Sequence, residues 1–398
     1  MPTLYMQTLQ KQDSLASHLY CSNCKKEYPV SSLHSYAFCC NKPLLVAYHS
    51  NHRLDKGLLR GRVNSMWRYQ EMLPLFDTRF KVSLGEGFTP MVRLNKLEKT
   101  FGFDHLTLKD EGINPTGSFK CRGISMALSK AKELGVKKCV IPTAGNAGVA
   151  MSAYAAAAGL EAIVIMPSNT PQAFKDACLF HGADLIFTDG LIDQCGELAA
   201  EIGQQTGAFN FSTLKEPYRL EGKKTIGYEI AEQFDWELPD VIIYPTGGGT
   251  GLIGIWKAFH EMEELGWISV GKLPRMIVVQ SSICSPVVDY INKGAPEAHY
   301  GSSVANGLSV PKAFGQALIS RVVSESGGCA ISVEEKGIVP NTLEIMKSEG
   351  LSICPEGGTV WMGLKQLVEL ELVGREERIL LINTGNADKY VAHFQDYL

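Results

Sequence analysis

The chain has 398 residues, of which 45% are hydrophobic and 20% are charged, and its formal net charge is -4. This composition is typical of a globular protein with a large core, and the length predicts two domains. Because the charge is close to neutral, there is no electrostatic reason to expect nucleic acid or a membrane as a partner.

The N-terminus and the cysteines indicate where the protein is located in the cell. The N-terminal residues MPTLYMQTLQKQDS contain no basic start followed by an apolar stretch, so a secretory signal is not expected. The eleven cysteines are mostly scattered singly, which predicts reduced thiols and a cytoplasmic location. Residues 149–166 form the most apolar segment, but Gly159 and Glu161 interrupt it. We interpret it as a buried helix followed by a buried strand.

Residues 1–50 are predicted to form a small appended module, because they combine four cysteines with short strand-like runs such as PLLVAY. The candidate metal ligands are Cys21, Cys24, Cys39 and Cys40. Thiols favour zinc, although adjacent ligands are awkward for tetrahedral coordination and His34 is an alternative fourth ligand. Zinc is therefore retained as a candidate cofactor.

The core is expected to begin near Ser83, after a linking arm at residues 51–80 that includes MWRYQEMLP. From Phe103 onward, continuous apolar runs alternate with helix-length segments, which is typical of parallel sheets covered on both faces. The predicted strands, in chain order, are LTL, KKCVIP, EAIVIMP, ADLIF, VIIYP, RMIVVQ and RILLIN.

Ligands of such sheets gather in loops at the carboxyl ends of strands. The first unusual loop is NPTGSFK at residues 114–120, where Pro115 and Gly117 mark a tight turn and Thr116 or Ser118 can cap the next helix. Lys120 then falls in the first helical turn, where the helix dipole favours a neutral amine suited to imine chemistry. The alternative is an ordinary solvated lysine.

The second loop is PTAGNAG at residues 142–148, where two glycines free backbone amides and Asn146 offers both a donor and an acceptor. Such a helix start binds carboxylates readily. An ordinary turn with a capping asparagine is the alternative.

The third loop is PTGGGTG at residues 245–251, a glycine cluster that opens a helix and so predicts a phosphate-binding turn. Gly249, Gly251 and Gly254 also match the dinucleotide fingerprint. That fingerprint requires an acidic residue at the end of the next strand, where Gln280 and two serines stand instead. A nucleotide P-loop at residues 222–225 is excluded because it lacks the earlier glycine.

Five motifs in order, GEGFTP, NPTGSFK, TAGNAG, PTGGGTG and NTGN, resemble those of fold-type-II pyridoxal-phosphate enzymes, and the threonine synthase family above all. The resemblance covers the chain from about Ser83. It implies an α/β fold of two three-layer α/β/α domains with mostly parallel sheets: a large one at 51–117 and 236–398, and a small one at 118–235. The N-terminal module resembles a zinc ribbon with a collapsed second cysteine pair.

The resemblance also implies pyridoxal 5'-phosphate as cofactor, a homodimer, and roles for individual residues. Lys120 forms the Schiff base and later shuttles protons, and Asn146 contacts the cofactor's 3'-oxygen. Thr384 meets the pyridine nitrogen, where a hydroxyl, unlike a carboxylate, leaves the ring a weaker electron sink. The alternative for Thr384 is a turn cap at the strand end. The residues implied to hold the phosphate are Gly247, Gly248, Gly249, Thr250 and Gly251.

The substrate is predicted from the segment FNFSTLKEPYRLEGKKT at residues 209–225, whose hydroxyls and guanidinium suit a phosphate ester. A similar segment in threonine synthases binds the phosphate of O-phosphohomoserine, and a solvated basic helix start is the alternative. The candidate substrate-binding residues are Thr143, Ser212, Thr213 and Arg219.

We therefore expect a lyase that converts O-phospho-L-homoserine and water into L-threonine and phosphate. Two alternatives remain open at this point. One keeps the cofactor but performs β-replacement or dehydration on phosphoserine, serine or threonine, including a cysteate-synthase-like reaction. The other is a non-catalytic nucleotide-binding module.

Overall fold

The computed structural model describes residues 14–49, 54–190, 192–297 and 299–397. Residues 1–13, where no export signal was predicted, lie outside the described residues, as does the predicted junction at 50–53. Among the described residues, no helix has the length and apolar character needed to cross a membrane. The apolar segment at 149–166 is a helix followed by a strand, as predicted.

The N-terminal module is an antiparallel sheet in the order β2-β1-β3. Its strands are β1 (Ala16–Cys21), β2 (Glu27–Pro29) and β3 (Leu44–Tyr48). The side chains of Leu15 and Leu45 join a hydrophobic cluster that includes residues of the central helices, and the Tyr48 hydroxyl donates to Glu221 at 2.7 Å. The module is therefore packed onto the body of the protein.

The larger of the two main sheets has the strand order β12-β11-β10-β13-β5-β4. All neighbours are parallel except the edge strand β4, which is antiparallel to β5. The strands are β4 (Met91–Arg93), β5 (His105–Asp110), β10 (Val241–Pro245), β11 (Arg275–Ser281), β12 (Ala330–Val333) and β13 (Arg378–Asn383).

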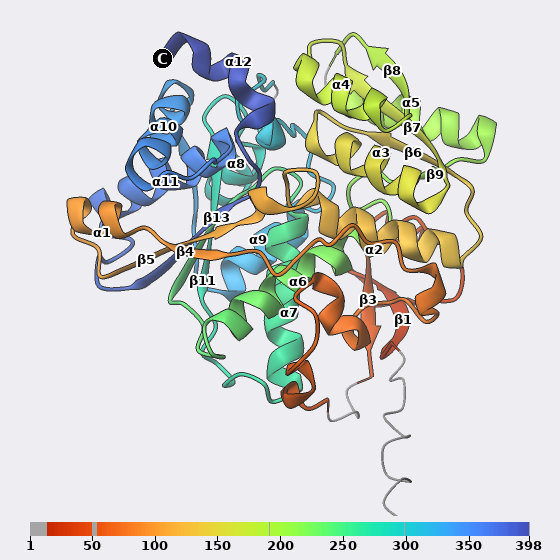
Figure 1. Cartoon of the computed structure of the whole chain (residues 1–398), viewed down its shortest axis with the longest axis horizontal. Coiled ribbons are helices and arrows are strands. Elements are labelled where there is room, and N and C mark those ends of the chain that lie inside the picture. The colour runs from red at the N-terminus through yellow and green to blue at the C-terminus, as the bar shows by residue number, and fades with distance from the viewer. Residues whose placement is uncertain (1–13, 50–53, 191, 298, 398) are drawn as a thin grey trace, which may run out of the picture.

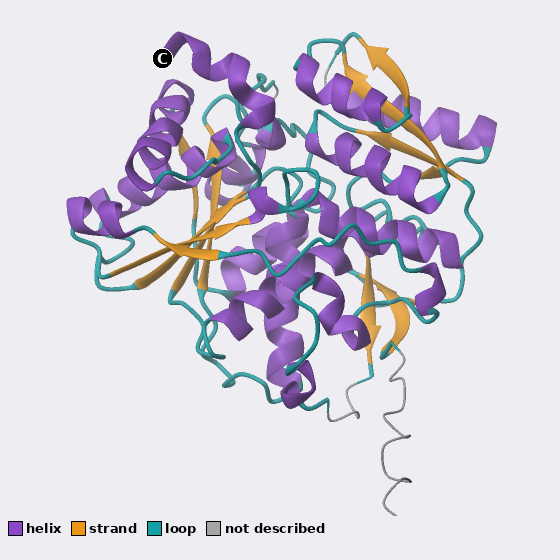
Figure 2. Cartoon of the chain, in the orientation of Figure 1, coloured by secondary structure: helices purple, strands orange, loops and turns teal. Residues whose placement is uncertain are grey.

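The second main sheet is parallel throughout, in the order β8-β7-β6-β9. Its strands are β6 (Lys138–Pro142), β7 (Glu161–Pro167), β8 (Asp184–Thr188) and β9 (Phe209–Asn210). Figure 2 shows both main sheets flanked by helices. The predicted α/β fold with two mostly parallel sheets and a small N-terminal sheet is confirmed.

The helices follow the strands in the predicted alternation. They are α1 (Asn95–Phe101), α2 (Lys120–Glu133), α3 (Asn146–Ala158), α4 (Gln172–Phe180), α5 (Ile192–Thr206), α6 (Tyr218–Gln233), α7 (Thr250–Glu264), α8 (Pro286–Lys293), α9 (Gln316–Glu325), α10 (Ile338–Glu349), α11 (Pro355–Glu369) and α12 (Val391–Phe394). Short 3-10 helices are η1 (Lys56–Leu59), η2 (Met66–Met72), η3 (Thr78–Phe80), η4 (Glu111–Ile113), η5 (Asn306–Leu308), η6 (Glu335–Gly337), η7 (Asp388–Tyr390) and η8 (Gln395–Tyr397).

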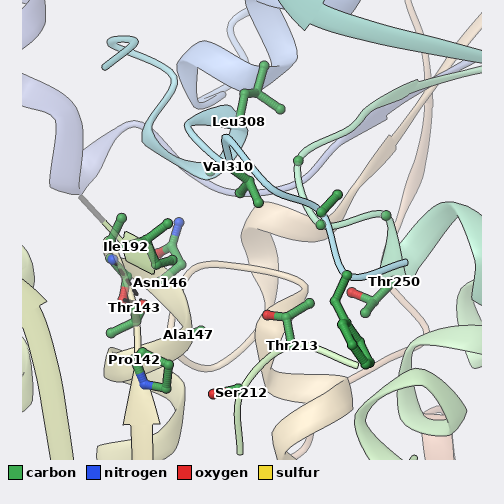
Figure 3. Close-up of a pocket in the computed structure, with 18 of the residues that line it drawn as sticks. Pro142, Thr143, Asn146, Ala147, Ile192, Ser212, Thr213, Thr250, Leu308 and Val310 are labelled. Carbon is green, nitrogen blue, oxygen red and sulfur yellow. Dashed lines mark hydrogen bonds between the residues drawn. The ribbon is translucent and has the colours of Figure 1, made fainter. Parts of the chain in front are cut away.

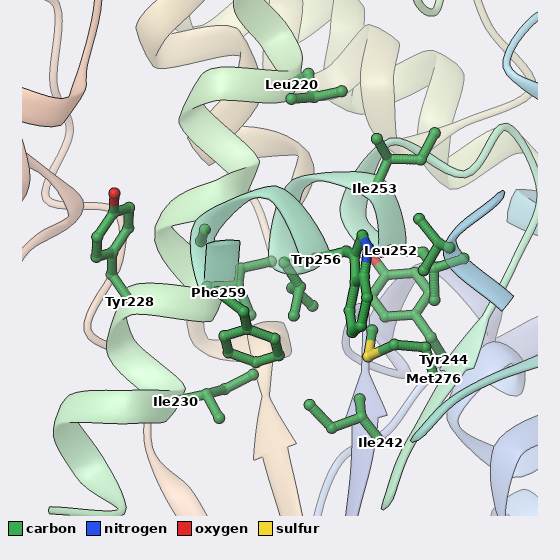
Figure 4. Packing of buried hydrophobic residues seen from close by; sticks show 14 of the residues in the cluster. Leu220, Tyr228, Ile230, Ile242, Tyr244, Leu252, Ile253, Trp256, Phe259 and Met276 are labelled. Carbon is green, nitrogen blue, oxygen red and sulfur yellow. The ribbon is translucent and has the colours of Figure 1, made fainter. Parts of the chain in front are cut away.

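Alternate residues of one strand enter different hydrophobic clusters, because successive side chains of a strand point to opposite faces. Ile242 packs with residues of α6 and α7, whereas its neighbour Ile243 packs with Trp361 of α11. Both faces of the large sheet are therefore covered, which explains why β10 is apolar along its whole length. Figure 4 shows the first of these clusters, with Leu252 and Phe259 of α7 beside α6.

Two helices at the centre position the functional site. In Figure 1, α6 and α7 run between the six-stranded sheet and the N-terminal strands β1 and β3. Helix α6 packs against both α2 and α7, and most of its length is buried, including several charged side chains. Those buried charges must be compensated within the protein or by a ligand.

The predicted linking arm is more deeply buried than expected. Within η2, Tyr69 is 1% exposed and its hydroxyl donates to Glu232 of α6, and Arg68 forms an ion pair with the same carboxylate at 2.7 Å. The arm is thus part of the core. The domain boundaries at 51–117, 118–235 and 236–398 remain a prediction.

Candidate active site

Every residue that the sequence predicted for cofactor or substrate binding lines one cavity of about 580 Å³. These residues are Lys120, Thr143, Asn146, Ser212, Thr213, Arg219, Gly247, Gly248, Gly249, Thr250, Gly251 and Thr384. Figure 3 shows Thr143 and Asn146 on one side of this cavity, with Ser212, Thr213 and Thr250 across from them. The loops at the carboxyl ends of β10 and β13, which are neighbours in the large sheet, therefore meet the loop after β6 of the second sheet at this cavity.

Lys120 is the first residue of α2, as predicted. Its Nζ lies 4.0 Å from the centre of the Phe119 ring, and no carboxylate among the described residues pairs with it. Burial, and after it the positive charge of Arg219, lower the pKa of this amine to about 8. A neutral amine is the form that condenses with an aldehyde.

The loop before Lys120 was expected to cap α2 with a side-chain hydroxyl, but its backbone holds it in place. Neither Thr116 nor Ser118 caps α2, because the Thr116 hydroxyl contacts the Cys121 thiol at 2.9 Å and the Ser118 hydroxyl has no partner among the described residues. The loop is held instead by its backbone. The amide of Phe119 donates to the carbonyl of Thr384 at 3.1 Å, which brings the end of β13 beside Lys120.

The glycine turn between β10 and α7 requires residues without side chains. Gly249 has a φ of 77°, and a Cβ there would lie 2.4 Å from Ile319. A Cβ at Gly251 would lie 1.8 Å from the Tyr244 hydroxyl. The turn therefore presents bare amides at the N-terminus of α7, an arrangement that fits a phosphate group.

Several buried polar atoms at this cavity have no hydrogen-bond partner among the described residues. They are Asn146 Oδ1, Arg219 Nε, the Tyr244 hydroxyl, Asn306 Nδ2 and Glu356 Oε2. Buried polar atoms are costly unless something satisfies them. Together with an amine whose pKa is lowered and a glycine turn whose bare amides fit a phosphate, these groups fit a polar, phosphorylated aldehyde such as pyridoxal 5'-phosphate.

The surroundings of Thr384 contain a thiol rather than a carboxylate. The Thr384 hydroxyl lies 3.7 Å from Cys354 Sγ, and that thiol donates to Asn383 Oδ1 at 3.4 Å. Burial raises the pKa of Cys354 well above its ordinary value, and the charge of Glu356 acts in the same direction. The thiol is therefore neutral, and it does not provide a negative partner for a pyridinium.

Asn146 and Thr143 lie on the loop after β6. Asn146 Nδ2 donates to the Tyr390 hydroxyl at 3.2 Å, and that hydroxyl donates to Glu356 at 3.1 Å. The Thr143 hydroxyl accepts from the Gly145 amide at 3.0 Å and so holds its own loop. The sequence reasoning missed Tyr390 and Glu356, which line the cavity, and Cys354, which contacts Thr384, because they stand outside the glycine-rich motifs and come to the site only through the fold.

A second group of polar side chains that could hold an anion lies where β9 leads into α6. Arg219 is 1% exposed, its Nη1 donates to the Phe211 carbonyl at 2.5 Å, and its Nε is 4.0 Å from Glu216. Burial raises the pKa of Glu216 to about 6. The Ser212 hydroxyl donates to Asn210 at 2.6 Å, and the methyl group of Thr213 lies against Gly248.

The basic cluster predicted at 209–225 is divided by α6. Lys223 lines the cavity and donates to the Thr250 hydroxyl at 2.5 Å. Lys224 points away from it and pairs with Glu221 at 2.7 Å and Glu261 at 2.8 Å. One residue step on a helix rotates the side chain by about 100°, which the sequence pattern did not resolve.

Gln280 stands where a dinucleotide-binding protein would have an acidic residue, and its side chain forms hydrogen bonds within the protein. Its Nε2 donates to the Thr246 carbonyl at 2.8 Å, and its Oε1 accepts from the amides of Val287 and Val288. It therefore joins the glycine turn to the start of α8. No carboxylate is needed there.

The cysteine cluster lies in the N-terminal module, away from the cavity residues. The sulfur atoms of Cys21, Cys24, Cys39 and Cys40 all lie within 4.8 Å of one another, and Cys24 and Cys39 are 3.4 Å apart. Tetrahedral zinc at ~2.3 Å from each thiolate requires sulfur atoms ~3.8 Å apart. The adjacency of Cys39 and Cys40 is therefore not an obstacle, and His34 is not part of the cluster.

Comparison with known proteins agrees with this geometry. The family model described as "Pyridoxal-phosphate dependent enzyme" matches residues 82–385. The chain is 34% identical over 382 residues to a threonine synthase of Methanocaldococcus jannaschii, covering 93% of this chain and 92% of that protein. It is 33% identical over 374 residues to a threonine synthase of Methanosarcina acetivorans, covering 93% and 91%.

Solved structures with the same fold are more distant in sequence. Maize serine racemase superimposes with a TM-score of 0.65 at 21% identity, over 78% of this chain and 91% of that one. Diaminopropionate ammonia lyase from Escherichia coli superimposes with a TM-score of 0.67 at 20% identity, over 80% and 89%. These similarities establish the fold.

Proposed function

The chain belongs to the family of pyridoxal-phosphate dependent enzymes, within the threonine synthase branch, and we propose that it converts O-phospho-L-homoserine and water into L-threonine and phosphate. One observation carries the choice of substrate. Buried Arg219, whose Nε has no hydrogen-bond partner among the described residues, lies in the same cavity as Lys120 and the glycine turn. The cavity thus offers a second site for a phosphate group.

The cofactor, when bound, supplies an electron sink for the negative charge that forms at the α-carbon of an amino acid. Lys120, Asn146, the turn at 247–251 and Thr384 would hold it. Because Thr384 offers a hydroxyl and not a carboxylate, the sink is a weak one, which suits elimination and replacement along the side chain.

The protein's own groups handle the substrate. Arg219, with Ser212 and Thr213 beside it, binds the phosphate ester and orients the γ-carbon. The neutral amine of Lys120 takes the α-proton and later returns a proton to the α-carbon. A β-proton passes to a base as the C–O bond at the γ-carbon breaks and phosphate leaves, and the γ-carbon then takes up a proton and becomes the methyl group of the product. Water then adds to the β-carbon.

The test is a product analysis of purified protein. Given O-phosphohomoserine, it should release phosphate and L-threonine in equal amounts, while phosphoserine, serine and threonine are turned over at least ~10-fold more slowly. Phosphate release and chiral chromatography measure both products. If no threonine forms from O-phosphohomoserine and phosphoserine or serine is consumed, the β-replacement or dehydration alternative replaces this proposal.

We also propose that the four clustered thiols bind zinc. Metal analysis of purified protein should find about one zinc per chain, and the double variant Cys21→Ser, Cys24→Ser should lose it. Cys329→Ser removes a half-buried thiol outside the cluster and serves as the control. Wild-type protein that contains no zinc after expression in zinc-supplemented medium would contradict the assignment. The homodimer and the cytoplasmic location remain predictions.

A further inference from the structure

Lys223 is a buried cation at the cavity that the sequence motifs did not assign to a ligand. It lies one turn after Arg219 on α6, so both side chains leave the same face of the helix. The side chain is 1% exposed, and its Nζ lies 4.9 Å from the centre of the Phe119 ring. Its only hydrogen-bond partner among the described residues is the hydroxyl of Thr250.

The charge of Lys223 is not compensated by the protein. Among the described residues no carboxylate lies within ion-pairing distance of its Nζ, and the nearest charged groups include the cations Arg219 and Lys120. Burial lowers the pKa of Lys223, these two cations lower it further, and only Glu216 opposes them. Three buried or half-buried cations around one cavity are expensive unless an anion occupies it.

The position of Thr250 indicates where that anion lies. Thr250 is the first residue of α7 and directly follows Gly249, whose conformation exposes the amides of the turn. A phosphate resting on those amides also comes within reach of the Thr250 hydroxyl and, through the same hydroxyl, of the Lys223 ammonium. Arg219 instead contacts the Phe211 carbonyl and Glu216, and it has no hydrogen bond to Thr250.

We propose that Lys223 is a ligand of the cofactor's phosphate group, so that a buried ammonium joins the amides of the glycine turn and the dipole of α7 in neutralising the dianion. The Nζ of Lys223 donates to a phosphate oxygen, and the Thr250 hydroxyl, which it now contacts, donates to another. This inference rests on the proposed placement of the phosphate at 247–251. It does not depend on which amino acid is the substrate.

The experiment compares two aldehydes that differ only in the phosphate group. Cofactor-free wild-type protein and the variants Lys223→Gln and Lys223→Met are titrated with pyridoxal 5'-phosphate and with pyridoxal, and binding is followed by visible absorbance. A lost charge-assisted hydrogen bond should weaken binding of the phosphorylated form by ~10–100-fold. Binding of pyridoxal should change by less than ~3-fold. Unchanged affinity for the phosphorylated form in both variants would overturn the proposal.

Lys224→Gln is the matched control, because the same substitution is made at the next residue of the same helix. It removes a partner of Glu221 and Glu261, so it should lower the melting temperature of the cofactor-free protein but leave the preference for the phosphorylated aldehyde unchanged. Lys223→Gln and Lys223→Met remove an unpaired buried charge, so they should not lower that melting temperature. If Lys223→Gln behaves like Lys224→Gln in both measurements, Lys223 is structural and the inference is wrong.

The two proposals fail in different ways. If wild-type protein gains no visible band with pyridoxal 5'-phosphate, the cofactor site itself is misplaced. If wild type gains the band and the Lys223 variants match its affinity, only the role of Lys223 is refuted. Two substitutions are used to guard against misfolding. Gln keeps a polar group at the end of the side chain, and Met keeps only a long, unbranched side chain.

Discussion

Lys223 and Lys224 are neighbours on one helix and are both buried, yet they serve opposite purposes. Lys224 pairs with Glu221 and Glu261, and its Nζ lies 3.7 Å from the centre of the Tyr48 ring. Lys223 has no carboxylate partner among the described residues and faces the cavity. Residue type, helix and burial are the same. Only the direction of the side chain differs.

The same division recurs on α2. Lys120 opens the helix at the cavity, whereas Arg122, fully buried, pairs with Glu111 at 2.6 Å and with Glu229 at 2.5 Å. Lys109 adds a second cation to Glu229 at 2.8 Å. A buried charge with an internal partner stabilises or specifies the fold, and one without a partner is retained for a ligand. Substitutions of the unpaired residues that face the cavity, the ligand side, should therefore affect ligand binding and catalysis. Substitutions of the ion-paired residues, the paired side, should affect stability.

The largest effect is expected for Lys120→Ala, on the unpaired side. Loss of the amine that holds the cofactor and moves the α-proton should reduce kcat by at least ~1000-fold. The melting temperature of the cofactor-free protein should stay within a few degrees of wild type, because the amine has no hydrogen-bond or ion-pair partner among the described residues and contacts only the Phe119 ring. Steady-state kinetics and thermal unfolding measure the two. A variant that kept a tenth of the activity would place the catalytic amine elsewhere.

On the paired side, Glu229→Gln should act on stability. It leaves Arg122 and Lys109 buried with less compensation, which typically costs ~3–5 kcal/mol of unfolding free energy. Burial raises the pKa of Glu229, but Arg122 and Lys109 outweigh it and lower the value to about 2.

The lowered pKa fixes the pH dependence of this contribution. The stabilisation by Glu229 is complete above its unfolded-state pKa of ~4.3 and is lost as the pH falls towards 2. Urea unfolding at pH 7 and pH 3 should therefore show a smaller acid-induced loss in the variant than in wild type. If the unfolding free energy falls equally in both proteins between pH 7 and pH 3, Glu229 does not contribute to the pH dependence of stability.

Arg219→Ala should have an intermediate effect, again on the ligand side. A lost charge-assisted contact to the substrate phosphate is worth ~2–4 kcal/mol, or a rise in KM of ~30–1000-fold. Stability should fall less than in Glu229→Gln, because the internal partners of Arg219 are one carbonyl at 2.5 Å and one carboxylate at 4.0 Å. Initial rates with O-phosphohomoserine give the KM. An unchanged KM would exclude Arg219 from substrate binding.

The smallest effect is a pH shift in cofactor loading. Because burial and the charge of Arg219 hold the pKa of Lys120 near 8, the neutral amine predominates above that pH. The rate of cofactor uptake should therefore rise with pH and level off above about 8, well below the ordinary lysine value. Arg219→Ala removes the repulsion and should move the midpoint upwards. A midpoint that does not move would show that burial alone sets this pKa.

Much of this molecule could be predicted from local pattern. The strands EAIVIMP, VIIYP and RILLIN coincide with β7, β10 and β13, because continuous apolar runs mark strands that are buried on both faces. The start of α2 at Lys120 followed from the Pro and Gly punctuation before it. The short strands β4, β9 and β12 were not predicted, since runs of two to four residues carry too little periodicity.

The sequence by itself determined the order of strands and helices and the loops that carry the candidate site, because apolar runs, glycines and prolines act through neighbours in the chain. Only the tertiary structure decided which charges are paired. It brought Glu356 and Tyr390 to the cavity, gathered Cys39 and Cys40 with Cys21 and Cys24, and separated Lys223 from Lys224. The direction of a buried side chain depends on which elements pack around its helix, and those elements are distant in sequence.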